Sequence, residues 1–292
     1  MKRFKRRMSR ILRKLTRRGA GVTRNEPALP AEPPEWERIP EWLPADKLRG
    51  WNAPGVSTIQ QQRWVEFLRQ VEGPGPLGVS HESDAIHGRE NVWPHNLLMT
   101  YGYVLGRACQ HRSSLSILDW GAGAGHYYVY SRALFPDLSL AYTAHDLPAL
   151  CAAGRSTLPD VTFDDDAEQV LSRTYNFVMA GSSLWYAENW KSLLGRLAVA
   201  ASEWVYVTRM IFMRQTSSFV AVQRPWKYGY DTEYQCWALN STEFLQAAHD
   251  ANLTLEREFI FGQAPAIHGC EEIGTFRGYL FRRPPANRGA FA

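Results

Sequence analysis

The chain has 292 residues, 45% of them hydrophobic, which suits one α/β domain with extensions better than two full domains. Its formal net charge of +4 is the sum of two unlike regions, because residues 1–18 hold ten of the 33 Lys and Arg residues and none of the 29 acids. Subtracting those ten leaves 23 basic against 29 acidic residues, a charge of −6, so we do not expect the body of the protein to bind nucleic acid. No apolar run approaches the ~18–20 residues that span a bilayer, and the sequence shows no apolar core of a signal peptide.

The basic N-terminal segment has a regular pattern. At 100° per residue its apolar side chains fall in one arc, and all ten basic side chains lie outside that arc. The apolar residues are Phe4, Met8, Ile11, Leu12 and Leu15. The pattern predicts an amphipathic helix over residues 1–21 that lies on an anionic membrane surface. A disordered basic arm that binds nucleic acid and a mitochondrial presequence are the alternatives.

The cysteines lie far apart and form no C-x-x-C pair. They are Cys109, Cys151, Cys236 and Cys270. The spacing predicts reduced thiols in a cytosolic compartment, without a disulfide framework or a metal site. We therefore expect a cytoplasmic protein, with peripheral attachment to the inner face of the membrane if residues 1–18 bind lipid.

Between the basic segment and the main domain we expect two regions. Residues 22–50 are rich in proline and predict a linker that becomes a strap over the globule. Residues 51–110 predict a helical cap, with helices over 59–71 and 96–109 and an irregular segment between them.

From residue 111 the sequence alternates between strand and helix patterns. The expected strands are 115–119, 139–145, 160–163, 175–181 and 203–209. The expected helices are 126–135, 147–154, 166–173 and 188–200. Such alternation predicts a parallel sheet with helices on both faces.

The rhythm changes after the fifth strand. Residues 210–240 read as an aromatic-rich insertion without assigned elements, and a helix follows over 241–251 with Ser241 as its N-cap. Strands at 254–261 and 274–282 then predict a closing antiparallel hairpin. The main domain is therefore expected to end near residue 285, with a tail over 286–292.

The stretch with the clearest functional pattern is residues 116–125, which read SILDWGAGAG. A short buried strand ends in an acid and runs through three glycines into a helix. Glycine permits positive φ and lets backbone N–H groups approach a ligand closely. A dinucleotide-binding fingerprint would require glycine where His126 stands. A structural turn between strand and helix is the alternative interpretation.

Asp119 followed by G-x-G-x-G resembles motif I of the class I S-adenosylmethionine (SAM) dependent methyltransferases. The resemblance implies a Rossmann-like α/β fold, with a seven-stranded, mostly parallel sheet that ends in an antiparallel hairpin and has helices on both faces. It implies SAM as cofactor, bound across the carboxyl ends of the central strands. The cofactor-binding residues that it implies are Asp119, Gly121, Ala122, Gly123, Gly125, Asp146, Leu147, Asp165, Asp166, Ser182 and Ser183.

In that resemblance Asp146 takes the place of the acid that binds the ribose hydroxyls, about 20 residues past the glycines. One acid of residues 164–166 would meet the adenine amino group, although a solvated helix N-terminus explains the same acids. Asn176 departs from the family pattern, since many relatives have Asp there, at a position that is usually structural.

A closer resemblance, over Trp51 to Arg283, is to an uncharacterised bacterial methyltransferase family that is often associated with surface-polysaccharide gene clusters. It rests on the segments GVSHE (78–82), HN (95–96), LDWG (118–121), GHYY (125–128), SSLWY (182–186) and YDTEY (230–234). The resemblance implies O-methylation of a glycan or a lipid-linked saccharide. An RNA methyltransferase with the basic segment as its arm, and a non-catalytic SAM-binding protein, are the alternatives.

No acceptor-site residues follow from that resemblance, so we take them from chemistry. A hydroxyl acceptor must lose its proton, and His81 and Glu82 are the candidate bases. Arg209 ends the fifth strand and is a candidate catalytic residue that pairs with an acidic acceptor. The candidate substrate-binding residues are His126, Tyr186, Tyr230, Glu233 and Trp237. Each of them has a structural alternative as a buried aromatic or a hydrogen-bonded polar group.

Overall fold

The computed structural model describes residues 32–77, 92–226 and 229–284. Pro34–Ala292 forms one compact unit that contains every element described below. The basic helix predicted over residues 1–21, and the candidate bases His81 and Glu82, lie outside the described residues. Within the described part of the chain, no helix combines the length and the apolar character that crossing a membrane requires.

Five parallel strands form the centre of the sheet, in the order β4-β3-β2-β5-β6. They are β2 (Ser114–Trp120), β3 (Ser139–His145), β4 (Thr162–Asp164), β5 (Tyr175–Gly181) and β6 (Ala201–Met213). The middle strands are apolar on both faces, and Ile117, Leu118 and Phe177 are fully buried. Continuous apolar runs are typical of parallel strands that helices cover on both sides.

The sheet is completed by an antiparallel hairpin. Strand β10 (Thr275–Arg282) lies between β6 and β9 (Thr254–Gln263) and pairs antiparallel with both. Together with the five parallel strands, this hairpin makes the seven strands that the methyltransferase resemblance implies, and three further strands extend the sheet to ten. The predicted Rossmann-like methyltransferase fold is therefore confirmed.

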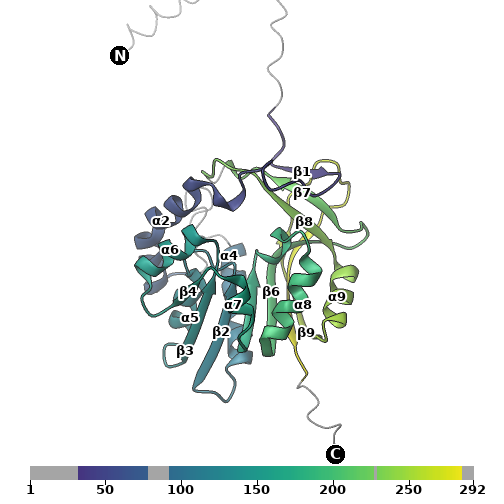
Figure 1. The fold of residues 1–292 in the computed structure, drawn as a ribbon. Helices are drawn as coiled ribbons and strands as arrows, with labels where there is room; N and C mark the ends of the chain where they lie inside the picture. Colours follow the sequence, from purple (N-terminus) through teal and green to yellow (C-terminus); the bar gives the residue numbers. More distant parts are fainter. Residues whose placement is uncertain (1–31, 78–91, 227–228, 285–292) are drawn as a thin grey trace, which may run out of the picture. The chain divides into compact units, whose positions relative to one another are not determined.

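Helices cover both faces of this sheet (Figure 1). One face packs against α4 (Val92–Ala108) and α5 (His126–Leu134), and α2 (Pro54–Glu72) adds Trp64 and Phe67 to the same core. The other face packs against α7 (Ala167–Leu171), α8 (Trp190–Ala200) and α9 (Ser241–Asp250). Helix α6 (Pro148–Thr157) follows β3. All four cysteines are unpaired.

Three further strands lie where the sequence predicted a strap and an irregular insertion. They are β1 (Trp36–Ile39), β7 (Phe219–Gln223) and β8 (Tyr234–Asn240). Strand β7 pairs antiparallel with β1 and β8, and β8 joins the last residues of β6 in parallel. The strand predicted at 203–209 was too short, because β6 continues to Met213, and its last residues pair with β8 of the added strands (Figure 1).

A β-bulge in β6 lies between the residues that pair with β5 and those that pair with β8. Met210 pairs with Arg277 and Val207 with Tyr279, so Thr208 and Arg209 together oppose the single residue Gly278. A bulge bends its strand and increases the local twist. Here it lies between the part of β6 that belongs to the central sheet and the part that pairs with β8.

One helix start differs from the prediction. The N-cap of α9 is Asn240, whose side-chain oxygen accepts the N–H groups of Thr242 and Glu243 at 2.9 and 3.2 Å. Ser241, predicted as the cap, is the first residue of the helix instead. Asn and Ser are both good caps, so the choice depended on where β8 ends.

Candidate active site

The glycine loop lies between β2 and α5, and each of its three glycines has a positive φ: 76° at Gly121, 58° at Gly123 and 90° at Gly125. Side chains there would also collide with neighbours. A Cβ on Gly121 would lie 2.2 Å from the Cβ of Ser183, and one on Gly125 would lie 2.8 Å from a methyl group of Leu158. Glycine is therefore required both for backbone conformation and for space.

Four of the five N–H groups in residues 121–125 are already used within the protein. Gly121 and Ala122 donate to the carbonyl oxygen of His145 at 2.8 and 3.1 Å, and Gly125 donates to that of Ala122 at 3.0 Å. Gly123 donates to Asp146 Oδ2 at 2.7 Å. The sequence suggested that loop N–H groups would approach a ligand. The structure indicates instead that the glycines let a ligand approach the backbone closely, while the N–H groups named above stay bonded within the protein.

Asp146 directly follows β3 and lines a cavity at the carboxyl edge of the sheet. Its Oδ1 accepts the N–H of Leu147 at 2.7 Å, and its Oδ2 accepts that of Gly123. Burial raises the pKa of this carboxyl, and the two N–H groups act in the opposite direction. Each carboxylate oxygen keeps a second acceptor site, so Asp146 can accept two hydroxyl groups from a ligand.

Asp119 lies near the end of β2 and is 1% exposed. The Tyr142 hydroxyl donates to Oδ2 at 2.8 Å, whereas Oδ1 has no hydrogen-bond partner among the described residues. Burial raises the pKa of Asp119 from 3.8 to about 7, the hydrogen bond from Tyr142 lowers it, and the charge of Asp146 raises it. Such a carboxyl is a ready partner for a cation, because a nearby positive charge favours its ionised form.

The three acids after β4 have different surroundings. Asp165 lines the cavity, and its hydrogen bond from Arg155 at 2.9 Å lowers its pKa. Asp164 instead accepts the N–H of Asp166 and lies 3.4 Å from Arg173. Asp166 is the N-cap of α7. Among the three, Asp165 is therefore the one that lines the cavity.

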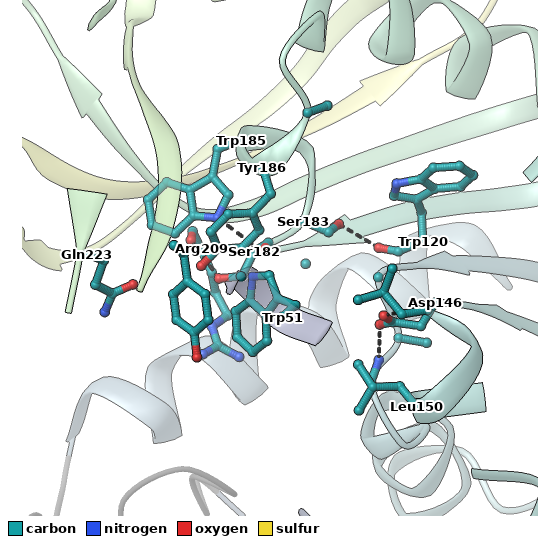
Figure 2. A pocket seen from close by; sticks show the side chains of 18 of the residues that line it. Trp51, Trp120, Asp146, Leu150, Ser182, Ser183, Trp185, Tyr186, Arg209 and Gln223 are labelled. Carbon is teal, nitrogen blue, oxygen red and sulfur yellow. Dashed lines mark hydrogen bonds between the residues drawn. The ribbon is translucent and has the colours of Figure 1, made fainter. Parts of the chain in front are cut away.

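The cavity measures about 1220 Å³ and extends from the glycine loop to the added strands. Its first part is lined by Gly121, Ala122, Gly123, Asp146, Leu147, Asp165, Ser182 and Ser183. Gly125, Asp119 and Asp166 do not line it. Figure 2 shows Asp146 and Trp120 on one side of the view and Trp185, Arg209 and Gln223 on the other, with Trp51 between them.

The second part of the cavity, which we call the aromatic compartment, is lined by Trp36, Trp42, Trp51, Trp93, Trp185, Tyr186, Tyr230, Tyr234 and Phe276. Trp51 stacks on Tyr234 with ring centroids 4.2 Å apart and an interplanar angle of 5°. Tyr186 meets the edge of Trp51 at 5.3 Å. These three rings come from the chain before α2, from the loop after β5 and from β8, and Trp93 of α4 and Phe276 of β10 line the same compartment. The compartment therefore exists only because segments far apart in the sequence meet.

Two of the predicted substrate-binding residues have other contacts. Glu233 accepts a hydrogen bond from Arg224 Nε at 2.7 Å, and Trp237 stacks on Trp42 with ring centroids 5.9 Å apart. Neither lines the cavity. Tyr186 and Tyr230 do line it, as does His126, which is 4% exposed and packs edge-on against aromatic rings of α2.

Ser182, Ser183 and Arg209 meet at the cavity wall. Ser182 donates its N–H to the carbonyl oxygen of Thr208 at 2.8 Å and its hydroxyl to that of Arg209 at 2.9 Å. Ser182 and Arg209 have positive φ values of 56° and 60°. The guanidinium of Arg209 lies over the ring of Trp93, 5.5 Å from its centroid. Backbone strain of this kind is typical of functional sites.

The predictions missed several residues that line the cavity, among them Gln60, Trp51, Trp120 and His145. The ring of His145 lies against that of Trp120 at a tilt of 31°, with centroids 4.1 Å apart. Both residues end strands that lead into predicted site residues, so their positions were a usable signal. Gln60 and Trp51 come from segments far from the glycine loop in the sequence, and only the tertiary structure brings them to it.

The chain matches no protein-family model and no curated protein sequence. Its structure is similar to solved methyltransferase structures. Magnesium protoporphyrin IX methyltransferase from Synechocystis PCC 6803, solved with bound SAH, has 12% identity and a TM-score of 0.46, over 78% of this chain and 99% of that one. A Burkholderia thailandensis 1,6-didemethyltoxoflavin-N1-methyltransferase has 13% identity and a TM-score of 0.47, over 84% and 93%. The N-terminal domain of EvdMO1, solved with SAH and D-fucose, has 14% identity and a TM-score of 0.48, over 77% and 95%.

Proposed function

We propose that this protein is a SAM-dependent methyltransferase that O-methylates a glycan or a lipid-linked saccharide. The observation that carries the proposal is the continuous cavity of about 1220 Å³, which has ionisable cofactor-type groups at one end and aromatic rings at the other. A methyl donor and an acceptor bound in these two parts would meet near Ser182 and Ser183. Catalysis of methyl transfer rests mainly on holding the two reactants in line.

The residues of the first part fit SAM. The glycines leave a cradle that side chains would fill, and Asp119 has a buried oxygen without a partner among the described residues. Asp146 would accept the ribose hydroxyls, Asp165 the adenine amino group, and Asp119 would favour the cationic amino group of the methionine portion. The cofactor would supply a methyl group activated by its positively charged sulfur.

The aromatic compartment supports a saccharide as the acceptor. Flat aromatic faces pack well against the C–H faces of sugar rings, and Trp51 and Tyr186 line the compartment. Arg209 would pair with a phosphate or a carboxylate of the acceptor. His81 and Glu82 remain our proposed bases from the sequence. The bacterial polysaccharide-associated family that the sequence resembles would use the same class of acceptor.

Calorimetry with S-adenosylhomocysteine tests the cofactor half of the proposal. We expect the wild type to bind, and Asp146→Ala to bind about 10- to 100-fold more weakly, because it removes a charged acceptor. Asp137→Ala is the matched control, since Asp137 is exposed and precedes the amino end of β3. Thermal unfolding checks that both variants are folded. Failure of the wild type to bind, or equal affinity of wild type and Asp146→Ala, would contradict the proposal.

Transfer of a tritiated methyl group from SAM into fractionated cell extract tests the acceptor. Label in polymeric or lipid-linked glycan supports the proposal. Label in RNA would favour the alternative in which residues 1–18 form an RNA-binding arm, and binding without any transfer would favour a non-catalytic SAM-binding protein.

Attachment to an anionic membrane through residues 1–18 is a separate proposal that rests on the sequence pattern. Co-sedimentation of the full chain with vesicles that contain anionic lipid tests it. Equal sedimentation with neutral vesicles, or none with either, would contradict it.

A further inference from the structure

Helix α2 carries one polar residue within its buried stripe. Val56, Gln60, Trp64, Phe67 and Val71 recur at helical spacing and are each less than 7% exposed. Trp64 and Phe67 pack against the first residue of α5, and Val56 belongs to a small cluster that includes one residue of α6, Leu150. Gln60 lies between them on the same face, so its side chain is directed at the loops that enclose the proposed cofactor site.

The side chain of Gln60 lies against the glycine loop. A Cβ placed on Gly123 would be 3.2 Å from Gln60 Oε1 and 3.6 Å from Nε2. Gln60 is 4% exposed and lines the cavity. Its Oε1 has no hydrogen-bond partner among the described residues. A buried amide oxygen without a partner is unfavourable, so this position calls for a ligand that supplies a donor.

The groups around Gln60 indicate which part of the cofactor it would meet. In the proposed function, Asp146 is the acceptor for the ribose hydroxyls and Asp165 is the acceptor for the adenine amino group. The N–H groups of Gly121, Ala122 and Gly123 are donated to His145 and Asp146, so they do not serve the cofactor's carboxylate. A zwitterionic amino acid needs both a donor and an acceptor, and a terminal amide offers both and turns readily about its last bond.

We infer that Gln60 binds the methionine end of SAM through its side-chain amide, with Nε2 donating to the carboxylate and Oε1 accepting from the amino group. The inference rests on the proposed function and adds a cofactor-binding residue from α2, outside the glycine motif. Through Gln60, helix α2, which packs near the aromatic compartment, would contact the bound cofactor directly.

Two ligands separate this role from a structural one. S-adenosylhomocysteine carries the amino-acid end, and 5′-methylthioadenosine lacks it but keeps the ribose and adenine. In calorimetry, we expect Gln60→Leu to weaken the affinity for S-adenosylhomocysteine about tenfold or more. Its affinity for 5′-methylthioadenosine should stay within about twofold of the wild-type affinity. Gln62→Leu, on the exposed face of the same helix, is the matched control and should change neither affinity.

Thermal unfolding of the cofactor-free variants supplies a second readout. Gln60→Leu should unfold at the wild-type temperature or above, because an apolar side chain replaces one whose buried oxygen has no partner among the described residues. Gln60→Leu with wild-type affinity for S-adenosylhomocysteine, or with equal weakening of both ligands, would overturn the inference. If the wild type binds neither 5′-methylthioadenosine nor S-adenosylhomocysteine, the proposed function is wrong, and so is the inference that rests on it.

Discussion

Replacing Asp119 with asparagine should stabilise the cofactor-free protein at neutral and alkaline pH. Burial raises the pKa of this carboxyl from 3.8 to about 7, so folding opposes its ionisation. Below pH ~4 the acid is protonated in both the folded and the unfolded state. As the pH rises from there to about 7, the unfolded chain ionises while the folded protein keeps its proton, and stability falls. Above about pH 7 the loss is complete.

The magnitude follows from the two pKa values. A difference between 3.8 and about 7, at about 1.36 kcal/mol per pH unit, corresponds to about 4 kcal/mol as an upper limit. Asn never ionises, and its side-chain oxygen can still accept the hydroxyl of Tyr142, which bonds Asp119 at 2.8 Å. The stability of Asp119→Asn relative to wild type should therefore grow from near zero around pH 4 towards this limit above pH 7.

Urea unfolding of both proteins at several pH values between 5 and 8.5, without cofactor, measures this difference. Asp137→Asn, at an exposed position, controls for a general effect of removing one acid. Asp119→Asn should also bind S-adenosylhomocysteine more weakly, because it lacks the charge that favours the cofactor's amino group. An Asp119→Asn protein that is less stable than wild type by the same amount at every pH would refute the reasoning, since it would mean that the folded protein holds Asp119 ionised.

Two further predictions concern single positions. Gly125→Ala should lower the free energy of unfolding by about 1–3 kcal/mol in urea titration, because residue 125 has a φ of 90° and its Cβ would lie 2.8 Å from Leu158. The control Gly195→Ala, in open space on a helix, should instead gain about 0.5–1 kcal/mol, and equal effects at both sites would contradict the explanation. Burial raises the pKa of Glu272, but the N–H groups of residues 214–216 outweigh it and the pKa is lowered. Glu272→Gln should therefore lose stability above pH ~4.3, and its difference from wild type should vanish as the pH falls through the lowered pKa; a pH-independent difference in thermal unfolding would oppose this.

Much of the fold could be predicted because its signals are local. The strands predicted at 139–145 and 175–181 match β3 and β5 residue for residue, since apolar runs and their flanking turns are contiguous in sequence. The position of Asp146 at the end of β3 is a property of one short segment, and parallel strands bring such ends to one edge of the sheet. The position of Asp165 at the carboxyl edge of the sheet could be predicted in the same way, but its hydrogen bond with Arg155 could not.

The aromatic compartment was not predictable in this way. The backbone of Leu43 pairs with the side chain of Gln235, 192 positions later, and β1 pairs with β7 in a register that neither segment specifies alone. Short strands with irregular flanks have no period that distinguishes them from a loop. The bulge at Arg209 is likewise visible only as a mismatch between β6 and β10.

By itself, then, the sequence determined the glycine loop, the order of strands and helices and the acids at the strand ends, because each depends on neighbouring residues and on the chirality rules of parallel sheets. Only the tertiary structure decided what encloses the ligand. Gln60 meets Gly123, and Trp51 meets Tyr234, through packing between segments that the chain keeps far apart. Contacts of that kind depend on the whole core and not on any local pattern, and they enclose both the proposed cofactor site and the aromatic compartment.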